Sequence, residues 1–233
     1  MNFYRYGKHM VMMDDPFDLL RPTTVTVRVS AKVNLALGVG NRAPDGFHPL
    51  ATVFEAICIY DEVTVTRRDD SRITLTISGE DANQVPTDET NLAWQAVELV
   101  RNESVPEWEN RGHGVDIHID KSIPVAGGMA GGSADAAGAL MAAAALYRIP
   151  DSPEELQPLA AELGSDVPFC LTGGVALGRG RGDRLAPVIC RGRHRWVFAT
   201  SNQGLSTPAV YRRFDELGGN PGGEAVPNDL ISA

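Results

Sequence analysis

The segment from Pro124 to Leu140, PVAGGMAGGSADAAGAL, constrains the fold of this chain more than any other. Gly127, Gly128, Gly131 and Gly132 allow the backbone to take positive φ angles and to approach a ligand closely, because glycine has no Cβ. The alanine-rich stretch that follows predicts a helix with small residues on every side. Such a helix packs closely against a sheet or another helix.

A glycine-rich loop before a helix is typical of a phosphate site, because free N–H groups and the positive end of the helix dipole point at it. The hydroxyl of Ser133 can bond a phosphate oxygen or a magnesium-bound water. The loop is not a Walker A loop, since GxxxxGK[ST] is absent, and it is not a dinucleotide loop, since its spacing is GGxxGG. The alternative interpretation is a tight turn that serves helix–sheet packing without a ligand.

Lys32 lies in the apolar segment SAKVNLAL, where a lysine needs an anionic partner or a function. Asp166, in LGSDVPF, follows a predicted helix end inside another apolar stretch. Such a carboxylate can accept a proton from a substrate hydroxyl, while the lysine keeps it ionised and stabilises developing charge. The alternative is a buried structural ion pair.

The segment RAPDGFH, residues 42–48, contains a turn at Gly46. Phe47 and His48 offer a stacking ring and a hydrogen-bonding ring side by side, and such a pair suits recognition of a planar base. A plain turn with one aromatic ring packed inward is the alternative.

The hydrophobic pattern predicts an α+β fold. A disordered extension is expected over residues 1–20, and a second unit from about Arg179. The predicted helix at 91–101 has Leu92, Val97, Leu99 and Val100 as its buried residues. Three other helices are predicted. One follows the glycine loop, one begins at the capping box of Ser152 and ends at Gly164, and one runs from Thr207 to Leu217. Strands are predicted at 23–39, 52–66, 72–78, 115–120, 174–178 and 196–201.

Composition excludes several classes of protein. Thirty acidic residues against twenty-one basic ones give a net charge of −9, which argues against a nucleic-acid or anionic-membrane surface. No apolar run approaches the roughly 18 residues of a membrane-spanning helix. Three distant cysteines, Cys58, Cys170 and Cys190, fit a reducing cytosol better than a disulfide framework or a zinc cluster. We therefore expect a cytoplasmic protein.

Three segments, in this order, resemble motifs of the GHMP kinases. AKVNLAL with RAPDGFH is similar to the first motif, PVAGGMAGGSADAA to the second, which cradles ATP phosphates, and LGSDVPF to the segment of the catalytic aspartate. The resemblance implies a two-domain fold: a ribosomal-protein-S5-like ATP-binding domain over 21–178 and an incomplete ferredoxin-like C-terminal domain over 179–233. The family's third, glycine-rich motif is missing from these 233 residues.

The resemblance also implies roles for individual residues. Asp166 would be the general base and Lys32 would orient it and stabilise the transferring γ-phosphoryl group; His48 would read a cytosine edge, with Phe47 in the stacking place usually filled by tyrosine. The implied substrate contacts are Asn34, Asp45, Phe47 and His48. The implied ATP contacts are Asn91, Pro124, Val125, Ala126, Gly127, Gly128, Met129, Ala130, Gly131, Gly132 and Ser133. Mg²⁺ would be bridged mainly by the phosphates, with Ser133 as an additional contact and no dedicated metal site.

The implied reaction is ATP-dependent phosphorylation of the 2-hydroxyl of 4-diphosphocytidyl-2-C-methyl-D-erythritol, giving the 2-phosphate and ADP, in the non-mevalonate route to isopentenyl diphosphate. A homoserine- or mevalonate-type kinase is one alternative, but a base-reading pair has no purpose for a small aliphatic alcohol. A non-catalytic nucleotide-binding pseudokinase is another. Retention of Lys32 and Asp166 argues against it, and the missing third motif argues for it.

Overall fold

The computed structural model describes residues 2–6, 9–13, 23–103, 114–192, 194–199 and 206–220, the first two segments by their backbone only. Within these residues a single mixed sheet has the strand order β1-β2-β3-β4-β6-β5, and β7 and β8 extend it from β4. The strands are β1 (Asn2–Tyr6), β2 (His9–Met13), β3 (Thr24–Val39), β4 (Leu50–Arg67), β5 (Ile73–Gly79), β6 (Val115–Lys121), β7 (Val175–Gly180) and β8 (Arg184–Pro187). The helices are η1 (Ala82–Gln84), α1 (Leu92–Glu103), α2 (Gly131–Tyr147), α3 (Pro153–Leu163), α4 (Val167–Thr172) and α5 (Thr207–Glu216).

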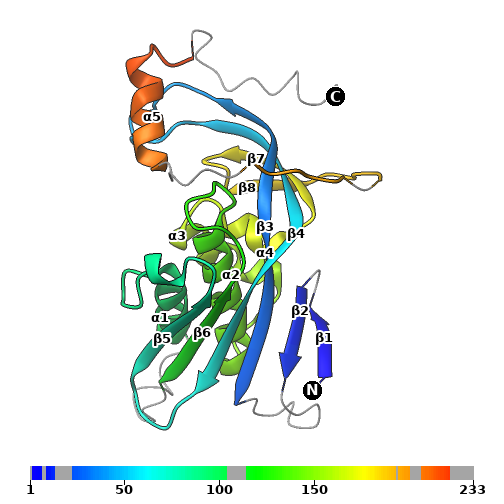
Figure 1. Cartoon of the computed structure of the whole chain (residues 1–233), viewed down its shortest axis with the longest axis vertical. Helices are drawn as coiled ribbons and strands as arrows, with labels where there is room; N and C mark the ends of the chain where they lie inside the picture. The colour runs from blue at the N-terminus through cyan, green and yellow to red at the C-terminus, as the bar shows by residue number, and fades with distance from the viewer. Residues whose placement is uncertain are drawn as a thin grey trace.

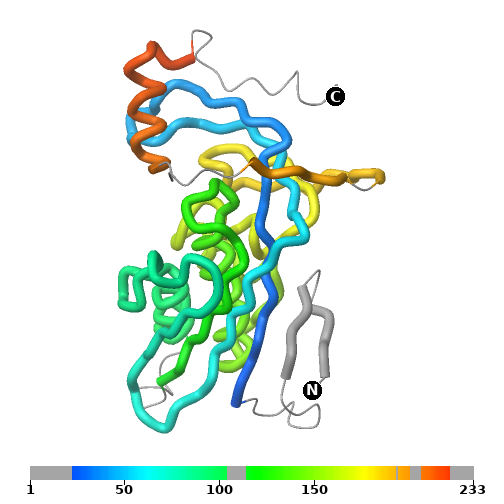
Figure 2. The backbone as a smooth tube through the Cα atoms, viewed as in Figure 1, coloured from blue at the N-terminus to red at the C-terminus, as the bar shows by residue number. Residues whose placement is uncertain are grey.

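The antiparallel pair β3–β4 forms the axis of the molecule and runs along most of its length (Figure 2). Val25, Val27 and Val29 alternate with polar residues along β3 and are completely buried on the helix side of the sheet. β4 changes partner along its length: residues 62–67 pair with β6, and residues 50–55 pair with β7. The β3–β4 register shifts between Ser30 and Lys32, so Lys32 lies close to this change of partner.

Helix α2 is central to the core, with α1, α3 and α4 beside it on the same face of the sheet (Figure 1). Nearly all of its residues are buried, as the small side chains in its sequence predict. Gly138 faces the sheet, where an added Cβ would come within 2.8 Å of Val63 Cγ2 and 2.9 Å of Val29 Cγ2. The absence of a side chain at this position therefore sets how closely the helix approaches the strands.

The predicted capping box opens α3: the Ser152 hydroxyl accepts from the Glu155 N–H, and the Glu155 carboxylate accepts from the Ser152 N–H. Gly164 follows the last residue of α3. After two more residues α4 begins, with Asp166 at its N-cap position. The short connection between the two helices thus carries Asp166 against the sheet.

Two details of the expected fold are wrong. Residues 196–199 of the expected strand 196–201 have no regular structure, because no described strand pairs with them; residues 200–201 lie outside the described part. In α1, Ala93 and Ala96 are buried instead of Leu92 and Leu99, which are only half-buried. Close packing of α1 on α2 favours the smaller side chains at the contact.

The proposed division of the chain stays a prediction. Strands β1 and β2 fall within the stretch 1–20 that was expected to be an extension, and β2 pairs with β3. The expected boundary at 178/179 falls inside β7. Among the described residues, no helix is long and apolar enough to cross a membrane.

Candidate active site

The glycine-rich loop connects β6 to α2 and is held to the sheet by one backbone contact. The Lys32 N–H donates to the Met129 carbonyl over 3.1 Å, so the loop lies against β3. Ala126, Gly128 and Ala130 all have positive φ angles of 55–72°. Ala130 is the N-cap residue of α2, and its side chain cannot accept a hydrogen bond from the first turn.

Open space borders this loop. A Cβ added at Gly128 or Gly132 would meet no atom within 4 Å, and residues 126–128 are exposed. The first turn of α2 receives no side-chain cap, so its N–H groups are available to an anion. These features fit the triphosphate of ATP, which needs close backbone approach and several N–H donors.

Lys32 and Asp166 converge beside the loop. The Lys32 ammonium lies 3.6 Å from Asp166 Oδ2 and donates to Asn34 Oδ1 over 2.9 Å. Asn34 in turn donates to the Thr52 hydroxyl over 2.7 Å, which fixes the amide. Lys32 is buried, whereas the Asp166 side chain is 32% exposed and makes no helix-capping hydrogen bond. Asp166 is therefore accessible to a substrate, and Lys32 is held beside it.

Burial raises the pKa of the Cys170 thiol on α4, and the negative charge of Asp166 raises it further. Cys170 is therefore a neutral, buried thiol behind the carboxylate. Cys58 and Cys190 are exposed.

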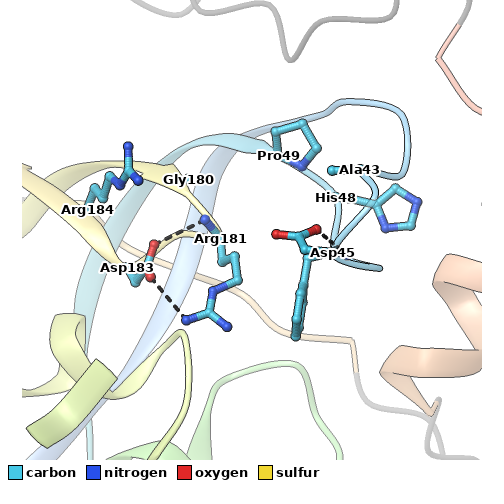
Figure 3. Close-up of a pocket in the computed structure, with 9 residues that line it drawn as sticks. Ala43, Asp45, His48, Pro49, Gly180, Arg181, Asp183 and Arg184 are labelled. Atoms are coloured by element: carbon cyan, nitrogen blue, oxygen red, sulfur yellow. Dashed lines mark hydrogen bonds and ion pairs between the residues drawn. The ribbon is translucent and has the colours of Figure 1, made fainter. Parts of the chain in front are cut away.

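The loop of residues 40–49 folds as a tight turn around Gly46, whose φ angle is 87°. The Asp45 carboxylate accepts from the Phe47 N–H over 3.0 Å, so it stabilises the turn. Figure 3 shows the pocket beside this turn, which has a volume of about 290 Å³. Its lining residues come from the turn and from the β7–β8 connection: Ala43, Asp45, Phe47, His48, Pro49, Gly180, Arg181, Asp183 and Arg184.

Phe47 and His48 line the same pocket but have different partners. Phe47 is 51% exposed, and the Arg181 guanidinium lies 4.9 Å from its ring centroid. His48 is buried against α5, where its Nε2 lies 2.8 Å from Asp215 Oδ1 and its ring stacks on Tyr211 at 4.8 Å. The two rings thus line one pocket but contact different neighbours, and their expected roles in recognising a planar base stay predictions.

Asn91 has a structural task at the start of α1. Its Oδ1 accepts from the Ala93 N–H over 2.8 Å, and its Nδ2 donates to the Pro86 carbonyl over 2.7 Å. The side chain is buried, so both ends of the amide are engaged. Its expected contact with ATP stays a prediction.

Sequence reasoning missed a buried ionic network beneath the glycine loop. Lys121 Nζ donates to Asp61 Oδ2 over 2.6 Å and to Asp135 Oδ2 over 2.8 Å, and all three residues are 0–3% exposed. A sequence signal did exist: Lys121 is in phase with the buried residues of β6, Val115 and Ile119. A lysine at a buried strand position requires carboxylate partners.

The fold and the loop–lysine–aspartate arrangement define a class of small-molecule kinases, and comparison with known proteins supports this directly. Residues 91–174, which include helices α1 to α4, match the family described as GHMP kinases N terminal domain. The chain is 91% identical over 210 residues to the 4-diphosphocytidyl-2-C-methyl-D-erythritol kinase of Cutibacterium acnes, covering 90% of this chain and 68% of the relative. It is 51% identical over 219 residues to the enzyme of that name from Mycobacterium tuberculosis, covering 93% of this chain and 67% of the relative.

Solved structures agree. A crystal structure of 4-(cytidine 5'-diphospho)-2C-methyl-D-erythritol kinase superimposes with a TM-score of 0.59 at 32% identity, covering 84% of this chain and 66% of that one. Homoserine kinase from Cytophaga hutchinsonii shares the fold, with a TM-score of 0.51 at 19% identity, covering 84% of this chain and 65% of that one. The chain thus belongs to the GHMP kinases, and within them to the 4-diphosphocytidyl-2-C-methyl-D-erythritol kinase family. It spans about two thirds of the length of these relatives.

Proposed function

We propose that this chain catalyses ATP-dependent phosphorylation of the 2-hydroxyl of 4-diphosphocytidyl-2-C-methyl-D-erythritol, giving the 2-phosphate and ADP. The main support is the Lys32–Asp166 pair at 3.6 Å, next to a glycine loop that the Lys32 backbone itself holds. Phosphoryl transfer depends chiefly on positioning and on charge stabilisation. A loop for the phosphates, a cation and an accessible carboxylate supply both.

In this proposal Asp166 accepts the proton of the attacking 2-hydroxyl. Lys32 orients the carboxylate and stabilises charge on the transferred group, and Asn34 orients Lys32 through the 2.9 Å hydrogen bond. The N–H groups of residues 127–133 bind the phosphates. Mg²⁺ supplies charge neutralisation between the phosphates when it is bound, and Ser133 would contact it.

The pocket beside the 40–49 turn would hold the cytosine. Gly40 directly follows β3 and is eight residues after Lys32, so the chain between the two ends of the site spans at most about 27 Å. A nucleoside diphosphate joined to a short polyol is an elongated molecule, and it would lie along this strand. The pocket lining includes neither Lys32 nor Asp166, which favours a substrate long enough to reach both places over homoserine or mevalonate.

The proposal includes a cytoplasmic location, which the three sparse cysteines support. It also includes an ATP-binding domain over residues 21–178 and a partial second domain over 179–233. Lining residues of the cytosine pocket come from both sides of that boundary, namely the turn of residues 40–49 and Gly180–Arg184.

A coupled assay of ADP formation tests the proposal. We expect the 233-residue chain with ATP and Mg²⁺ to turn over 4-diphosphocytidyl-2-C-methyl-D-erythritol, and not homoserine or mevalonate. A matched measurement with ATP alone gives the background hydrolysis. Turnover of homoserine or mevalonate in preference would assign another GHMP substrate. ATP binding without turnover of any of the three would support the pseudokinase alternative.

A further inference from the structure

The buried network of Asp61, Lys121 and Asp135 joins three separate elements at one point. Asp61 comes from β4, Lys121 is the last residue of β6, and Asp135 lies in the second turn of α2. The glycine loop starts just after Lys121 and ends just before α2. The network therefore links the two ends of the loop to each other and to the sheet.

Asp61 also holds the entry to the loop through its other oxygen. Its Oδ1 accepts from the Ser122 N–H over 2.6 Å and from the Ile123 N–H over 2.8 Å. At the exit, a Cβ on Gly131 would lie only 3.2 Å from Lys121 Nζ, so the ammonium fits directly under the first turn of α2. The position of the loop is thus set from below by charged groups with almost no access to water.

The charges of the network do not balance. Two carboxylates and one ammonium leave one excess negative charge, and that charge lies beneath a loop suited to bind phosphates. Asp135 carries the excess: its Oδ1 is buried and has no hydrogen-bond partner, whereas both oxygens of Asp61 accept hydrogen bonds. A buried carboxylate oxygen without a donor is costly, and a proton on it removes the charge and most of that cost.

The pKa shifts of Asp135 and Lys121 also favour a proton on Asp135. Burial is the largest cause and raises the pKa of Asp135 to about 7; the repulsion of Asp61 adds to burial, and the two together outweigh the attraction of Lys121. Burial alone would lower the pKa of Lys121, but the charge of Asp135 and the hydrogen bonds to both carboxylates raise it, so the lysine stays charged.

The groups that face Asp135 are few. Asp61 faces it from β4 and Lys121 from β6. The charge of Asp135 also raises the pKa of the neutral Cys170 thiol on α4. On β3 the charged group nearest the loop is Lys32, which is paired with Asp166. From α1 and α3, no ion pair or hydrogen bond to Asp135 is present in the described part of the chain.

We propose that Asp61, Lys121 and Asp135 position the phosphate loop, and that nucleotide binding is linked to a proton on Asp135. This inference rests on the proposed function, because it takes the loop as the site of the ATP phosphates. With Asp135 protonated the network is neutral and the loop accepts the phosphates. With Asp135 ionised its charge opposes them, so binding of ATP takes up a proton.

The test is calorimetric titration of the 233-residue chain with MgATP between about pH 6 and pH 8.5. At each pH the titration is repeated in two buffers of different ionisation enthalpy, which counts the protons taken up. We expect the Kd to rise about fivefold across this range, as the repulsion between the buried charge of Asp135 and the phosphates implies. A net proton uptake should accompany binding near neutral pH.

Asp135→Asn keeps the shape and removes the titration, so its Kd should stay flat and close to the wild-type value at low pH. Asp120→Asn is the matched control: Asp120 precedes Lys121 on β6 but is exposed on the opposite face of the sheet. It should retain the wild-type profile. Asp61→Asn removes the repulsion that raises the pKa of Asp135, so the rise in Kd should begin at lower pH; this variant also serves if Asp135→Asn does not fold.

Identical pH profiles for the wild type and Asp135→Asn overturn this inference while leaving the proposed function intact. An unchanged midpoint in Asp61→Asn overturns it as well. Failure of the wild type to bind MgATP at any pH overturns the proposed function, and this inference with it.

Discussion

Replacement of Lys32 by methionine removes the ammonium and keeps most of the side-chain volume. At 3.6 Å, the attraction between Lys32 and Asp166 is about 5 kcal/mol with an effective dielectric constant of about 20. Because the Asp166 side chain is 32% exposed, water screens part of this, and about half is a fair measure of what the site loses. A loss of about 2.5 kcal/mol in the transition state corresponds to a kcat lower by a factor on the order of a hundred.

The assay is steady-state ADP formation with both substrates saturating, together with calorimetry for MgATP. We expect Lys32→Met to lower kcat about a hundredfold and to change the Kd for MgATP far less, since backbone N–H groups bind most of the phosphate charge. Arg28→Met is the matched control: it removes an exposed cation from the same strand, where Arg28 pairs only loosely with Glu62 at 3.8 Å. A kcat for Lys32→Met within about threefold of wild type, or an equal loss in Arg28→Met, would refute the reasoning.

Two further substitutions test the cytosine pocket and the core. His48→Ala should raise the KM for the cytidine substrate at least about tenfold and leave the KM for ATP nearly unchanged, because it removes a buried ring that lines the proposed cytosine pocket. His118→Ala, on the exposed face of β6, should change neither KM. Equal losses for both substrates in His48→Ala would contradict a role for His48 in binding cytosine. Gly138→Ala should lower the free energy of unfolding in urea by about 1–3 kcal/mol, since its Cβ would meet Val63 at 2.8 Å. Gly132→Ala in the same helix has open space and should cost nothing; equal stability of the two variants would contradict the packing described for α2.

Local sequence patterns predicted much of the fold. The alternation of Val25, Val27 and Val29 predicted the buried face of β3, and the capping box at Ser152 predicted the start of α3. The small residues of α2 predicted a helix buried on all sides. These features were predictable because each depends on residues within a few positions of one another.

The pairing of Lys32 with Asp166 was predictable for a different reason. A charged residue in an apolar segment must find an opposite charge, and each of these two segments contained one candidate. The same logic applied to Lys121 would have predicted that this lysine has carboxylate partners, because it occupies a buried position of β6. Which carboxylates they are could not be read from the pattern, since Asp61 and Asp135 are 60 and 14 residues away.

The environment of His48 could not be predicted. Its partner Asp215 lies 167 residues further along the chain, on a helix with no buried residue of its own. Helix α5 and the residues that follow it are held to the turn of residues 40–49 by a few specific contacts, among them the hydrogen bond from the Asn220 N–H to Asn41 Oδ1. No periodic pattern encodes such contacts, because periodicity reports only burial.

The most direct test of the proposed kinase is single-turnover phosphoryl transfer by Asp166→Asn. The amide keeps the shape of the carboxylate but cannot accept the proton of the 2-hydroxyl at neutral pH. We expect the rate to fall by about a thousandfold, as loss of a general base implies, while the Kd for MgATP stays within about twofold of wild type. Phosphoryl transfer by Asp166→Asn at close to the wild-type rate would contradict the assignment of Asp166 as the base and return the Lys32–Asp166 pair to a purely structural role.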